Sequence, residues 1–370
     1  MKKRLGDYIK EYSVRNKENQ DIPVYSVTNT EGFCQDYFGK EVASKDKSTY
    51  KIVPQGYFAY NPSRINVGSV DWQRTQERVI VSPLYNVFSV SDKLDQQYLY
   101  YYLKSDFALQ RIKAVATGSV RDNLKLKMLY EFPINIPELS SQKNIVELLD
   151  KIKKIEGLKK AELDYFDTLV KARFVEMFRD IPVDITLSDA CRIITDGTHQ
   201  SPKFKNKGIP FLFVSNIADN RLTYNTEKFI DEDTYNELIK RTPIEVGDVL
   251  LSTVGSYGHP AVVEDRRKFL FQRHIAYLKP DYEKIDSYYL YALLLTDLVQ
   301  YQIDRHVKGI AQKTLNLKEI KNLKIPLPTI EEQRIFTAFF RETNKSKVAI
   351  QKSLDETQIL FQSLMQKYFG

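Results

Sequence analysis

The sequence contains few of the residues from which disulfide frameworks and metal sites are built. Only two of its 370 residues are cysteines, Cys34 and Cys191, and they are far apart in the chain. A disulfide framework is therefore not expected, and a reducing cytoplasm is the expected compartment. The four histidines lack the spacing of a zinc site, so no metal is expected. They are His199, His259, His274 and His306.

Long apolar runs are also missing. No stretch approaches 18 consecutive apolar residues, so no membrane span is expected. The basic residues in MKKRLGDYIKEYS are not followed by an apolar run, and this stretch does not resemble a signal peptide. In contrast, 24 Tyr and 20 Phe argue against disorder. A chain of this length is expected to form two or more domains.

The motifs of several enzyme classes are absent as well. A methyltransferase needs a glycine-rich cofactor loop and an Asn/Asp-Pro-Pro-aromatic tetrapeptide, of which Asn61-Pro62-Ser63-Arg64 shares only the first two positions. No G-x-x-x-x-G-K-[ST] phosphate loop occurs, so intrinsic ATP hydrolysis is not expected. No carboxylate–lysine cluster typical of nucleases stands out. The chain is therefore not expected to be an enzyme.

Charge gives only a weak indication of function. The net charge is +7, as is common for nucleic-acid binders. However, residues 180–330 contain 20 basic and 20 acidic residues, so this part is neutral. Charge alone does not decide whether the chain binds DNA.

The strongest signal in the sequence is an internal repeat. The segment 117–142 aligns without a gap to 308–333, at an offset of 191 residues. The same offset relates Tyr98-Leu99-Tyr100 to Tyr289-Leu290-Tyr291. Nearer the start, IPVYSVTN (22–29) parallels IPFLFVSN (209–216) after a small change of offset. Each copy covers about half of the chain, so each is expected to be a domain with its own appendage.

Both copies have the same predicted layout. Short β-like runs rich in aromatic and β-branched residues come first, separated by Gly, Pro and Asn. A helical stretch follows at 95–116 and at 286–307, and then a Pro-bounded extended piece, EFPINIP or LKIPLP. Each copy ends in a long helix, with Ser140 or Ser141 as the expected N-cap of the first. Thr329 and Glu332 form a capping-box pattern for the second.

Thirty-eight helical residues would span roughly 57 Å, too long for one small domain to cover. Each helix is therefore expected to pack on the other as an antiparallel coiled coil. A generic oligomerisation coiled coil is the alternative. The expected inter-helix packing residues are Ile145, Leu149, Ile152, Leu163, Phe166, Val170, Ile335, Phe339, Leu354, Phe361 and Leu364.

The predicted fold is α+β, with two globular α/β domains separated by two long helices and related by a pseudo-two-fold axis. The expected bounds are 1–139 for the first domain, 140–179 for the central helix, 180–328 for the second domain and 329–370 for the last helix.

This pattern resembles the specificity subunits of type I restriction–modification systems. The stretches that carry the resemblance extend over the whole chain and follow the family's domain order. They are YNPSRINVGSV (60–70), GSVRDNLK (118–125) and ELSSQKNIVELLDKI (138–152) in the first copy, and DGTHQSP (196–202), GIPFLFVSNI (208–217), VGDVLLSTVGSYG (246–258), FQRHIAYLKP (271–280) and LPTIEEQRIF (327–336) in the second.

The resemblance implies a division of labour. Each target-recognition domain would read one half of a bipartite site in double-stranded DNA, and the helices would dock two modification subunits. Those subunits would use S-adenosylmethionine to methylate adenine, and restriction subunits using ATP and Mg²⁺ would join for cleavage. This chain would itself hold no cofactor.

Side chains in punctuated loops are the candidates for DNA contact, because base edges are read by such groups while cations and hydroxyls bind phosphates. Those of the first copy are Tyr60, Asn61, Arg64, Asn66, Ser69, Arg74, Gln76, Arg121 and Asn123. A structural turn is the alternative for Asn61 and Ser63, and packing is the expected role of Trp72.

The candidates of the second copy are Thr198, His199, Gln200, Lys203, Ser256, Tyr257, His259, Gln272, Arg273, Gln312, Lys313 and Thr314. Surface hydrogen bonding is the alternative for His and Tyr here, and turn capping is the alternative for Arg121, Asn123 and 312–314. The competing function for the whole chain is a coiled-coil adaptor with two ligand-binding heads and no DNA-reading role.

Overall fold

The computed structural model describes residues 2–35, 46–116, 123–307 and 313–370. The chain divides into two compact units, Met1–Ala161 with Gln351–Gly370, and Glu162–Ile350. The expected division into two domains and two helices differs from this one, because each long helix contributes part of its length to each unit. Both units combine helices with sheets, as the predicted α+β class requires.

The first unit is built on a four-stranded antiparallel sheet in the order β2-β9-β6-β7. A β5–β8 ribbon and the β3–β4 hairpin accompany it. The strands are β1 (Lys3–Arg4), β2 (Ile9–Glu11), β3 (Ser26–Thr28), β4 (Gly32–Cys34), β5 (Lys51–Pro54), β6 (Phe58–Tyr60), β7 (Val70–Trp72), β8 (Arg78–Val81), β9 (Asn86–Val90) and β10 (Pro133–Ile134).

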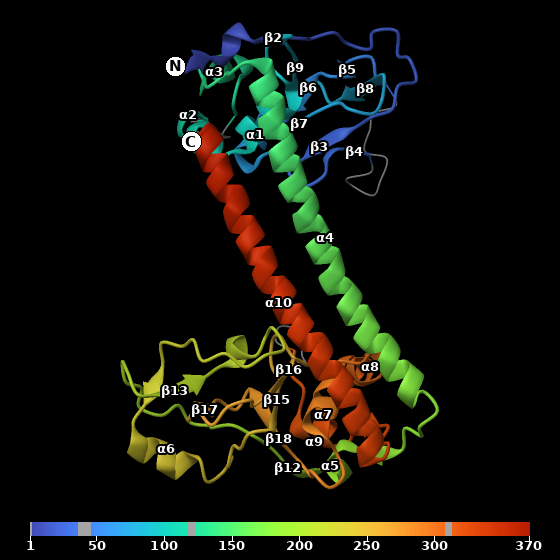
Figure 1. Ribbon diagram of the computed structural model, residues 1–370, viewed down its shortest axis with the longest axis vertical. Helices are drawn as coiled ribbons and strands as arrows, with labels where there is room; N and C mark the ends of the chain where they lie inside the picture. The colour runs from blue at the N-terminus through green and yellow to red at the C-terminus, as the bar shows by residue number, and fades with distance from the viewer. Residues whose placement is uncertain (1, 36–45, 117–122, 308–312) are drawn as a thin grey trace. The chain divides into compact units, whose positions relative to one another are not determined.

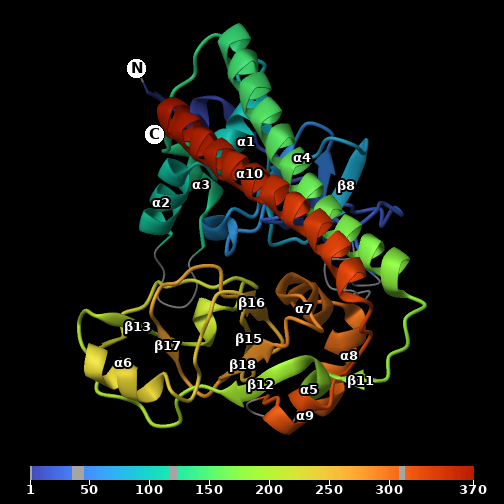
Figure 2. The ribbon, with the colours of Figure 1, turned by 60° about the horizontal axis from the view of Figure 1, so that its bottom comes forward.

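The second unit repeats this sheet in the order β12-β18-β15-β16, which can be followed in Figure 2. All of its pairings are again antiparallel. A three-stranded sheet, β14-β13-β17, is formed by strands that lie between β12 and β18 in the sequence. The strands are β11 (Ile185–Thr186), β12 (Cys191–Asp196), β13 (Ile209–Leu212), β14 (Phe229–Ile230), β15 (Val249–Ser252), β16 (Pro260–Val262), β17 (Leu270–Phe271), β18 (Ile275–Pro280) and β19 (Lys324–Ile325).

The repeat is therefore present in the structure as well as in the sequence. Strands β6 and β7 correspond to β15 and β16 at about the predicted offset. The parallel bridge between Val24 and Ile80 has its counterpart in the parallel pairing of Phe211 with Leu270. Val24 and Phe211 are 187 residues apart, the changed offset that the two IP motifs predict, whereas Ile80 and Leu270 are 190 residues apart.

The Pro-bounded extended pieces form short strands. In the first unit β10 pairs antiparallel with β1, and in the second β19 pairs antiparallel with β11. The chain thus enters and leaves each globular domain through one two-stranded ribbon.

The helical stretches predicted at 95–116 and 286–307 are each two helices rather than one. Ser105 ends α1 (Gln96–Lys104) and caps α2 (Asp106–Val115), because its extended backbone breaks the helix and its hydroxyl accepts a hydrogen bond from Ala108 N. Between α7 (Ser287–Leu294) and α8 (Asp297–His306), Leu295 is the C-cap of the first helix. Thr296 is the N-cap of the second, and its hydroxyl accepts a hydrogen bond from Val299 N. The other helices of the two domains are α3 (Leu126–Tyr130), α5 (Leu187–Ala190), α6 (Glu232–Leu238), α7 (Ser287–Leu294), α8 (Asp297–His306) and α9 (Leu317–Lys321), with 3-10 turns η1 (Leu5–Asp7), η2 (Ile65–Val67) and η3 (Val214–Asn216).

The two long helices are α4 (Leu139–Phe178) and α10 (Ile330–Phe369). Helix α4 begins at Leu139, so the expected capping by Ser140 or Ser141 is wrong. The capping box before α10 is confirmed, because Glu332 Oε2 accepts from Thr329 N at 2.9 Å and Thr329 Oγ1 accepts from Glu332 N at 3.4 Å. Gly157 does not interrupt α4.

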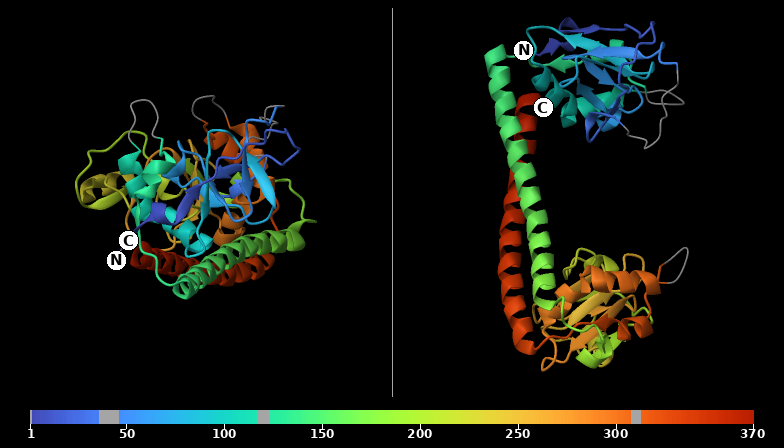
Figure 3. Two further views of the ribbon diagram at one scale, coloured as in Figure 1. Left: turned by 90° about the horizontal axis from the view of Figure 1, so that it is seen from above. Right: turned by 90° about the vertical axis from the view of Figure 1, so that its right-hand side faces the viewer.

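Within the first unit, the early part of α4 packs antiparallel on the last part of α10 (Figure 1; Figure 3, right). Lys159 Nζ donates to Ser353 Oγ at 2.7 Å, and the ammonium group of Lys153 lies 4.3 Å from the centre of the Phe361 ring. Phe361, with Met365 and Phe369 beyond it, joins the hydrophobic core of the globular domain.

Within the second unit, the late part of α4 packs on the early part of α10, again antiparallel. Phe174 and Phe178 make edge contacts with the Phe336 ring, at centroid distances of 5.5 and 5.6 Å. Asp167 forms an ion pair with Lys347. In each unit, therefore, the two helices pair with each other as the apolar stripes predict.

Ten of the eleven expected packing residues are buried or half-buried. Ile335 is the exception at 51 % exposed, and the adjacent Phe336 is fully buried in its place. The error is one residue of helical phase at the start of α10. In the described part of the chain, no helix combines the length and apolar character needed to span a bilayer.

Candidate nucleic-acid interface

Seven of the candidate residues lie in two equivalent hairpin loops, one in each unit. The first hairpin loop, 61–69, joins β6 to β7, and the second, 253–259, joins β15 to β16. Leu124 N donates to Pro62 O at 3.0 Å, and Leu315 N donates to Thr253 O at 2.8 Å. Leu124 and Leu315 are 191 residues apart, as are Pro62 and Thr253. The same backbone contact therefore joins each hairpin loop to the equivalent later segment of its unit.

The first hairpin loop is shaped by its own backbone bonds and presents one unengaged cation. Asn61 Oδ1 accepts from Ser63 N at 3.1 Å, which is the turn role considered for it. Gly68 ends the loop with φ +87, a left-handed conformation that favours glycine. Arg64 is exposed, and its guanidinium has no hydrogen bond or ion pair with any described residue. Asn66 is half-buried beside it.

Two candidates of this hairpin are buried, Tyr60 at the end of β6 and Ser69 at the end of the first hairpin loop. Tyr60 is fully buried, and its hydroxyl donates to Leu124 O at 3.0 Å. Burial raises the pKa of Tyr60. Ser69 is only 2 % exposed. The prediction of Tyr60 as a DNA-contacting residue is wrong, because its side chain belongs to the domain core. Ser69 stays a prediction, since it lines the polar pocket beside Arg64.

A small polar pocket opens beside Arg64. Its walls are the β3 strand and turn on one side and the first hairpin loop on the other. The lining residues are Ser26, Val27, Thr28, Asn29, Asn61, Arg64, Ser69 and Tyr85. The pocket therefore combines a free guanidinium with amide and hydroxyl groups, which are the donors and acceptors that read base edges.

Lys104 holds the two walls of this pocket together. From α1 its ammonium group donates to Asn29 O at 3.1 Å and to Gly68 O. Burial lowers the pKa of Lys104, and the nearby carboxylate of Asp71 opposes that change. The side chain is thus committed to positioning the loop, and sequence reasoning missed it because it lies on a helix 36 residues away from Gly68.

The remaining candidates of the first unit are divided. Asn123 is exposed next to Leu124, and so next to the first hairpin loop, whereas Arg121 lies outside the described residues. Arg74 and Gln76 follow the far end of β7, so the structure does not bring them to Arg64.

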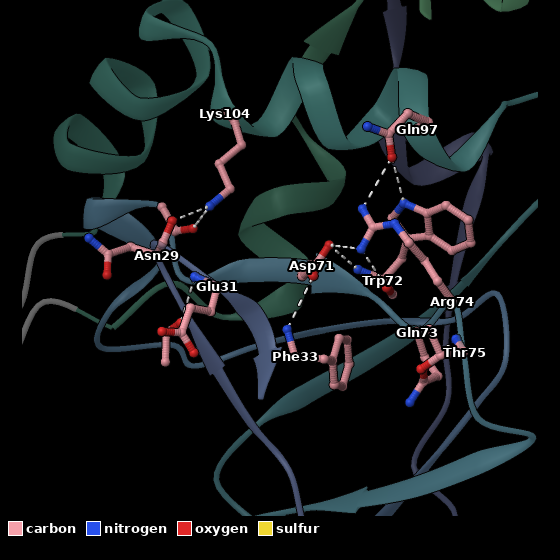
Figure 4. Close-up of polar contacts among 12 residues, drawn as sticks. Asn29, Glu31, Phe33, Asp71, Trp72, Gln73, Arg74, Thr75, Gln97 and Lys104 are labelled. Atoms are coloured by element: carbon pink, nitrogen blue, oxygen red, sulfur yellow. Dashed lines mark hydrogen bonds and ion pairs between the residues drawn. The ribbon is translucent and has the colours of Figure 1, made fainter. Parts of the chain in front are cut away.

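Arg74 is engaged within its own unit (Figure 4). Its guanidinium donates to Asp71 Oδ1 at 2.8 Å and to Gln97 Oε1 at 3.1 Å, and lies 4.5 Å from the Trp72 ring centre. Trp72 Nε1 donates to the same Gln97 oxygen at 3.1 Å, so the packing role expected for Trp72 is confirmed. Asp71 is almost fully buried and also accepts from Phe33 N at 3.2 Å. The cluster has the form of a structural brace.

The second hairpin loop carries a different set of side chains. Ser256 is exposed, and Tyr257 is half-buried with its hydroxyl donating to Asp304 Oδ1 at 2.9 Å. Lys313 lies with its ammonium 5.8 Å from the Tyr257 ring centre, and its backbone oxygen accepts from Gly255 N. His259 Nδ1 lies 2.9 Å from Asn220 Oδ1, so surface hydrogen bonding describes this histidine.

Backbone bonds join this loop to two further candidate segments. Thr253 N donates to His274 O at 3.0 Å, and Arg273 N donates to Thr198 O at 3.0 Å. Arg273 is exposed, Gln272 is half-buried, and a β-bridge pairs Gln272 with Thr198. The candidates of the second unit are therefore contiguous through these backbone contacts. Thr314 pairs with Val254 in another bridge, while Gln312 lies outside the described residues.

His199 belongs to a polar cluster that the sequence did not predict. Its Nε2 lies 2.9 Å from Asp196 Oδ2, while Arg241 contacts the other oxygen of the same carboxylate. Gln200 and Lys203 are exposed further along the loop. Arg241 is 42 residues away from His199, so no local pattern could have connected the two.

Among the described residues, no group of three His, Cys, Asp or Glu side chains is placed to hold a metal ion. The site consists instead of hydrogen-bonding and cationic side chains on loops, arranged in two related but chemically different sets.

Comparison with known proteins gives a consistent result. The chain is 24 % identical over 373 residues to the type I restriction enzyme EcoBI specificity subunit of Escherichia coli, covering 89 % of this chain and 78 % of that protein. It is 22 % identical over 399 residues to the StySPI specificity subunit of Salmonella potsdam, covering 98 % and 84 %.

Solved structures share the fold. A chain from a study of complex assembly and conformational transition of the type I R-M system aligns with a TM-score of 0.60, at 18 % identity, covering 100 % of this chain and 97 % of that one. The type I restriction-modification S subunit from M. genitalium aligns with a TM-score of 0.59, at 15 % identity, covering 100 % and 96 %.

A family model described as the type I restriction modification DNA specificity domain matches residues 3–165 and again 183–358. The two matches correspond to the two copies of the repeat and together cover most of the chain. The chain therefore belongs to the family of type I restriction–modification DNA specificity domains.

Proposed function

We propose that this chain is the sequence-reading subunit of a type I restriction–modification complex, in which each unit reads one half of a bipartite site in double-stranded DNA. One observation carries the proposal. The same hairpin loop occupies the same place on the same sheet in both units, yet it carries Asn61, Arg64 and Asn66 in one and Ser256, Tyr257 and His259 in the other. Two copies of one fold that present different polar side chains on equivalent loops are suited to binding two different half-sites.

The chemistry of the first loop fits base reading. Arginine can bind guanine through two hydrogen bonds, and asparagine can bind adenine in the same way. Arg64 has no partner among the described residues, so it needs to break no internal bond to contact DNA. Lys104 holds the loop in one conformation, which reduces the ordering cost of binding.

Partner subunits complete the proposed complex. Exposed apolar side chains on α4 and α10 of the first unit are of the kind that mark protein interfaces. They are Leu148, Ile155, Leu158, Ile359 and Leu360. We assign two modification subunits, with S-adenosylmethionine, to the helices, and restriction subunits with ATP and Mg²⁺ to the full complex. In this proposal the chain supplies the DNA sequence specificity, and its partners carry out the reactions.

The proposed compartment is the cytoplasm. Cys34 and Cys191 are free thiols, and burial raises the pKa of Cys191 to about 12, which keeps it protonated. Two unpaired thiols suit a reducing environment.

The test is methylome sequencing of cells that express the chain with its modification subunits. We expect a bipartite motif, two short specific sequences separated by unspecified bases. A graft of 253–259 onto the first hairpin loop should change one half of the motif and leave the other half unchanged.

The adaptor alternative predicts a different outcome. If the chain only tethers other proteins, modification of DNA would not depend on either hairpin loop. A gel shift with the modification subunit present would then show no preference for the methylated motif over scrambled DNA, and the proposal would be withdrawn.

A further inference from the structure

A buried glutamine joins α4 to the first globular domain. Gln142, in the first turn of α4, is fully buried. Its Oε1 accepts from Asp95 N at 2.9 Å, and its Nε2 donates to Lys93 O at 3.0 Å and to Pro137 O at 2.8 Å. Asp95 is the N-cap of α1, so this side chain ties the start of the long helix to the start of a helix of the domain.

The second unit repeats this arrangement. Gln333, in the first turn of α10, is fully buried, and its Oε1 accepts from Asp286 N at 2.8 Å. Its Nε2 donates to Lys284 O at 2.8 Å and to Pro328 O at 2.9 Å. Asp286 is the N-cap of α7. We call the two arrangements the first and second latch.

Every member of the first latch matches its counterpart at the offset of 191. A tyrosine strengthens each one in the same way: Tyr98 hydroxyl donates to Asn135 O at 2.8 Å, and Tyr289 hydroxyl donates to Pro326 O at 2.8 Å. The second latch has one more bond, from Thr337 Oγ1 to Asp286 Oδ1 at 2.7 Å. At the position equivalent to Thr337 the first unit has Val146.

The latch geometry admits one orientation of the amide. Both N–H groups of the glutamine face carbonyl oxygens and its oxygen faces an N–H, so rotating the amide by half a turn would place oxygen against two carbonyls. Apolar contacts would tolerate small rotation or sliding of a helix, whereas hydrogen bonds among buried groups are directional and costly to break. Gln142 and Gln333 therefore fix how each long helix leaves its domain.

We infer that Gln142 and Gln333 are positioning residues for spacer measurement: by fixing the helix–domain joints, they limit the number of base pairs that can separate the two half-sites. The inference rests on the proposed bipartite reading. One extra base pair shifts a half-site by about 3.4 Å and rotates it by about 35°. A rigid joint cannot follow this change, but a loosened one can.

The test uses the complex with its modification subunits and a DNA library in which the two half-sites are constant and the spacer varies. Methylation of each spacer length is counted by sequencing. With a rigid joint, a spacer of the wrong length should cost at least one base contact. Losing a base contact weakens binding roughly 5- to 150-fold, so we expect the parent complex to prefer its best spacer over its neighbours by about tenfold or more. In Gln142→Leu or Gln333→Leu that preference should fall to about threefold or less, with the recognised bases unchanged.

The matched controls are Ile112→Ala and Ile303→Ala, which remove equivalent fully buried core side chains without touching a latch. They should lower the melting temperature and keep the spacer preference. Gln142→Met and Gln333→Met keep the length of the side chain without placing an oxygen against the two carbonyl oxygens, and serve if the leucine variants do not assemble.

The outcomes are distinct. Broadened spacing in latch variants but not in core variants supports the inference. An unchanged spacer preference in the latch variants overturns it, as does equal broadening in the core controls. Failure of all four latch variants to assemble assigns the glutamines a purely structural role and also overturns it. A parent complex without a two-part site would instead refute the proposed function.

Discussion

Two arginines of the first unit, ten residues apart, should respond in opposite ways to removal. Arg64 is exposed and unpaired among the described residues, so Arg64→Ala should change the free energy of unfolding by no more than about 0.5 kcal/mol. If its guanidinium binds a base edge, the variant should lose about 1–3 kcal/mol of binding to one half-site, or roughly 5- to 150-fold. Reading of the other half-site should be unchanged.

For Arg74 we expect the reverse, a loss of stability without a change of base preference. Its side chain is 37 % exposed, but it neutralises Asp71, whose side chain is only 5 % exposed. Breaking a buried ion pair costs about 3–5 kcal/mol, and partial exposure of Arg74 reduces this to about 1–3 kcal/mol of unfolding free energy. Arg74→Ala should therefore lower the melting temperature, while the surviving complex keeps its base preference.

Both variants can be measured in the same two assays. Thermal denaturation gives stability, and methylation of DNA panels altered in one half-site at a time gives specificity. Equal loss for Arg64→Ala on every DNA sequence would reduce Arg64 to a phosphate contact. Altered base preference in Arg74→Ala at unchanged stability would refute the division between a reading arginine and a bracing one.

Three further predictions concern the helices and the partners. Hydrogen bonding to Lys160, on the same helix, is the main cause that lowers the pKa of the mostly buried Glu156 to about 2 from 4.5. Its contribution to the free energy of unfolding, about 1–3 kcal/mol, should therefore be complete above about pH 4.5 and lost as the pH falls towards 2. Unfolding curves of Glu156→Gln should lose this acid dependence, and an unchanged dependence would contradict the assignment. Inserting four residues, about one helical turn, within 141–178 of α4, matched by four in α10, should change the preferred spacer length; an unchanged spacer would refute the ruler role of the helices. The isolated chain should bind S-adenosylmethionine no better than a control protein, and saturable heat in calorimetry would overturn the proposed division of labour.

The sequence predicts the fold of this protein well, because the folding unit occurs twice in it as an internal repeat. A single offset of 191 relates the bond from Leu124 to Pro62 with the bond from Leu315 to Thr253. Extended apolar periodicity likewise predicts both long helices to within a residue or two of α4 and α10.

The candidate site is predicted less completely. Whether a side chain is exposed to DNA depends on how its loop packs, and no local sequence pattern encodes that packing. Tyr60 has the residue type of a base contact, but its place at the end of β6 turns it into the core. Arg241 and Lys104 contact their loops across long stretches of chain, so only the folded structure connects them. Ile335 shows that a small error in helical phase exchanges a solvent-facing residue for a packed one.

The ribbons β1–β10 and β11–β19 have a consequence for how such a chain can change. Each globular domain begins and ends at one pair of adjacent strands. The residues between these two strands can therefore be replaced without moving the points where the domain joins the long helices. A gene that exchanges residues between these borders would obtain a new half-site while the spacing device stays as it was. One exchange between these borders would then replace a whole recognition surface at once, which single substitutions cannot do.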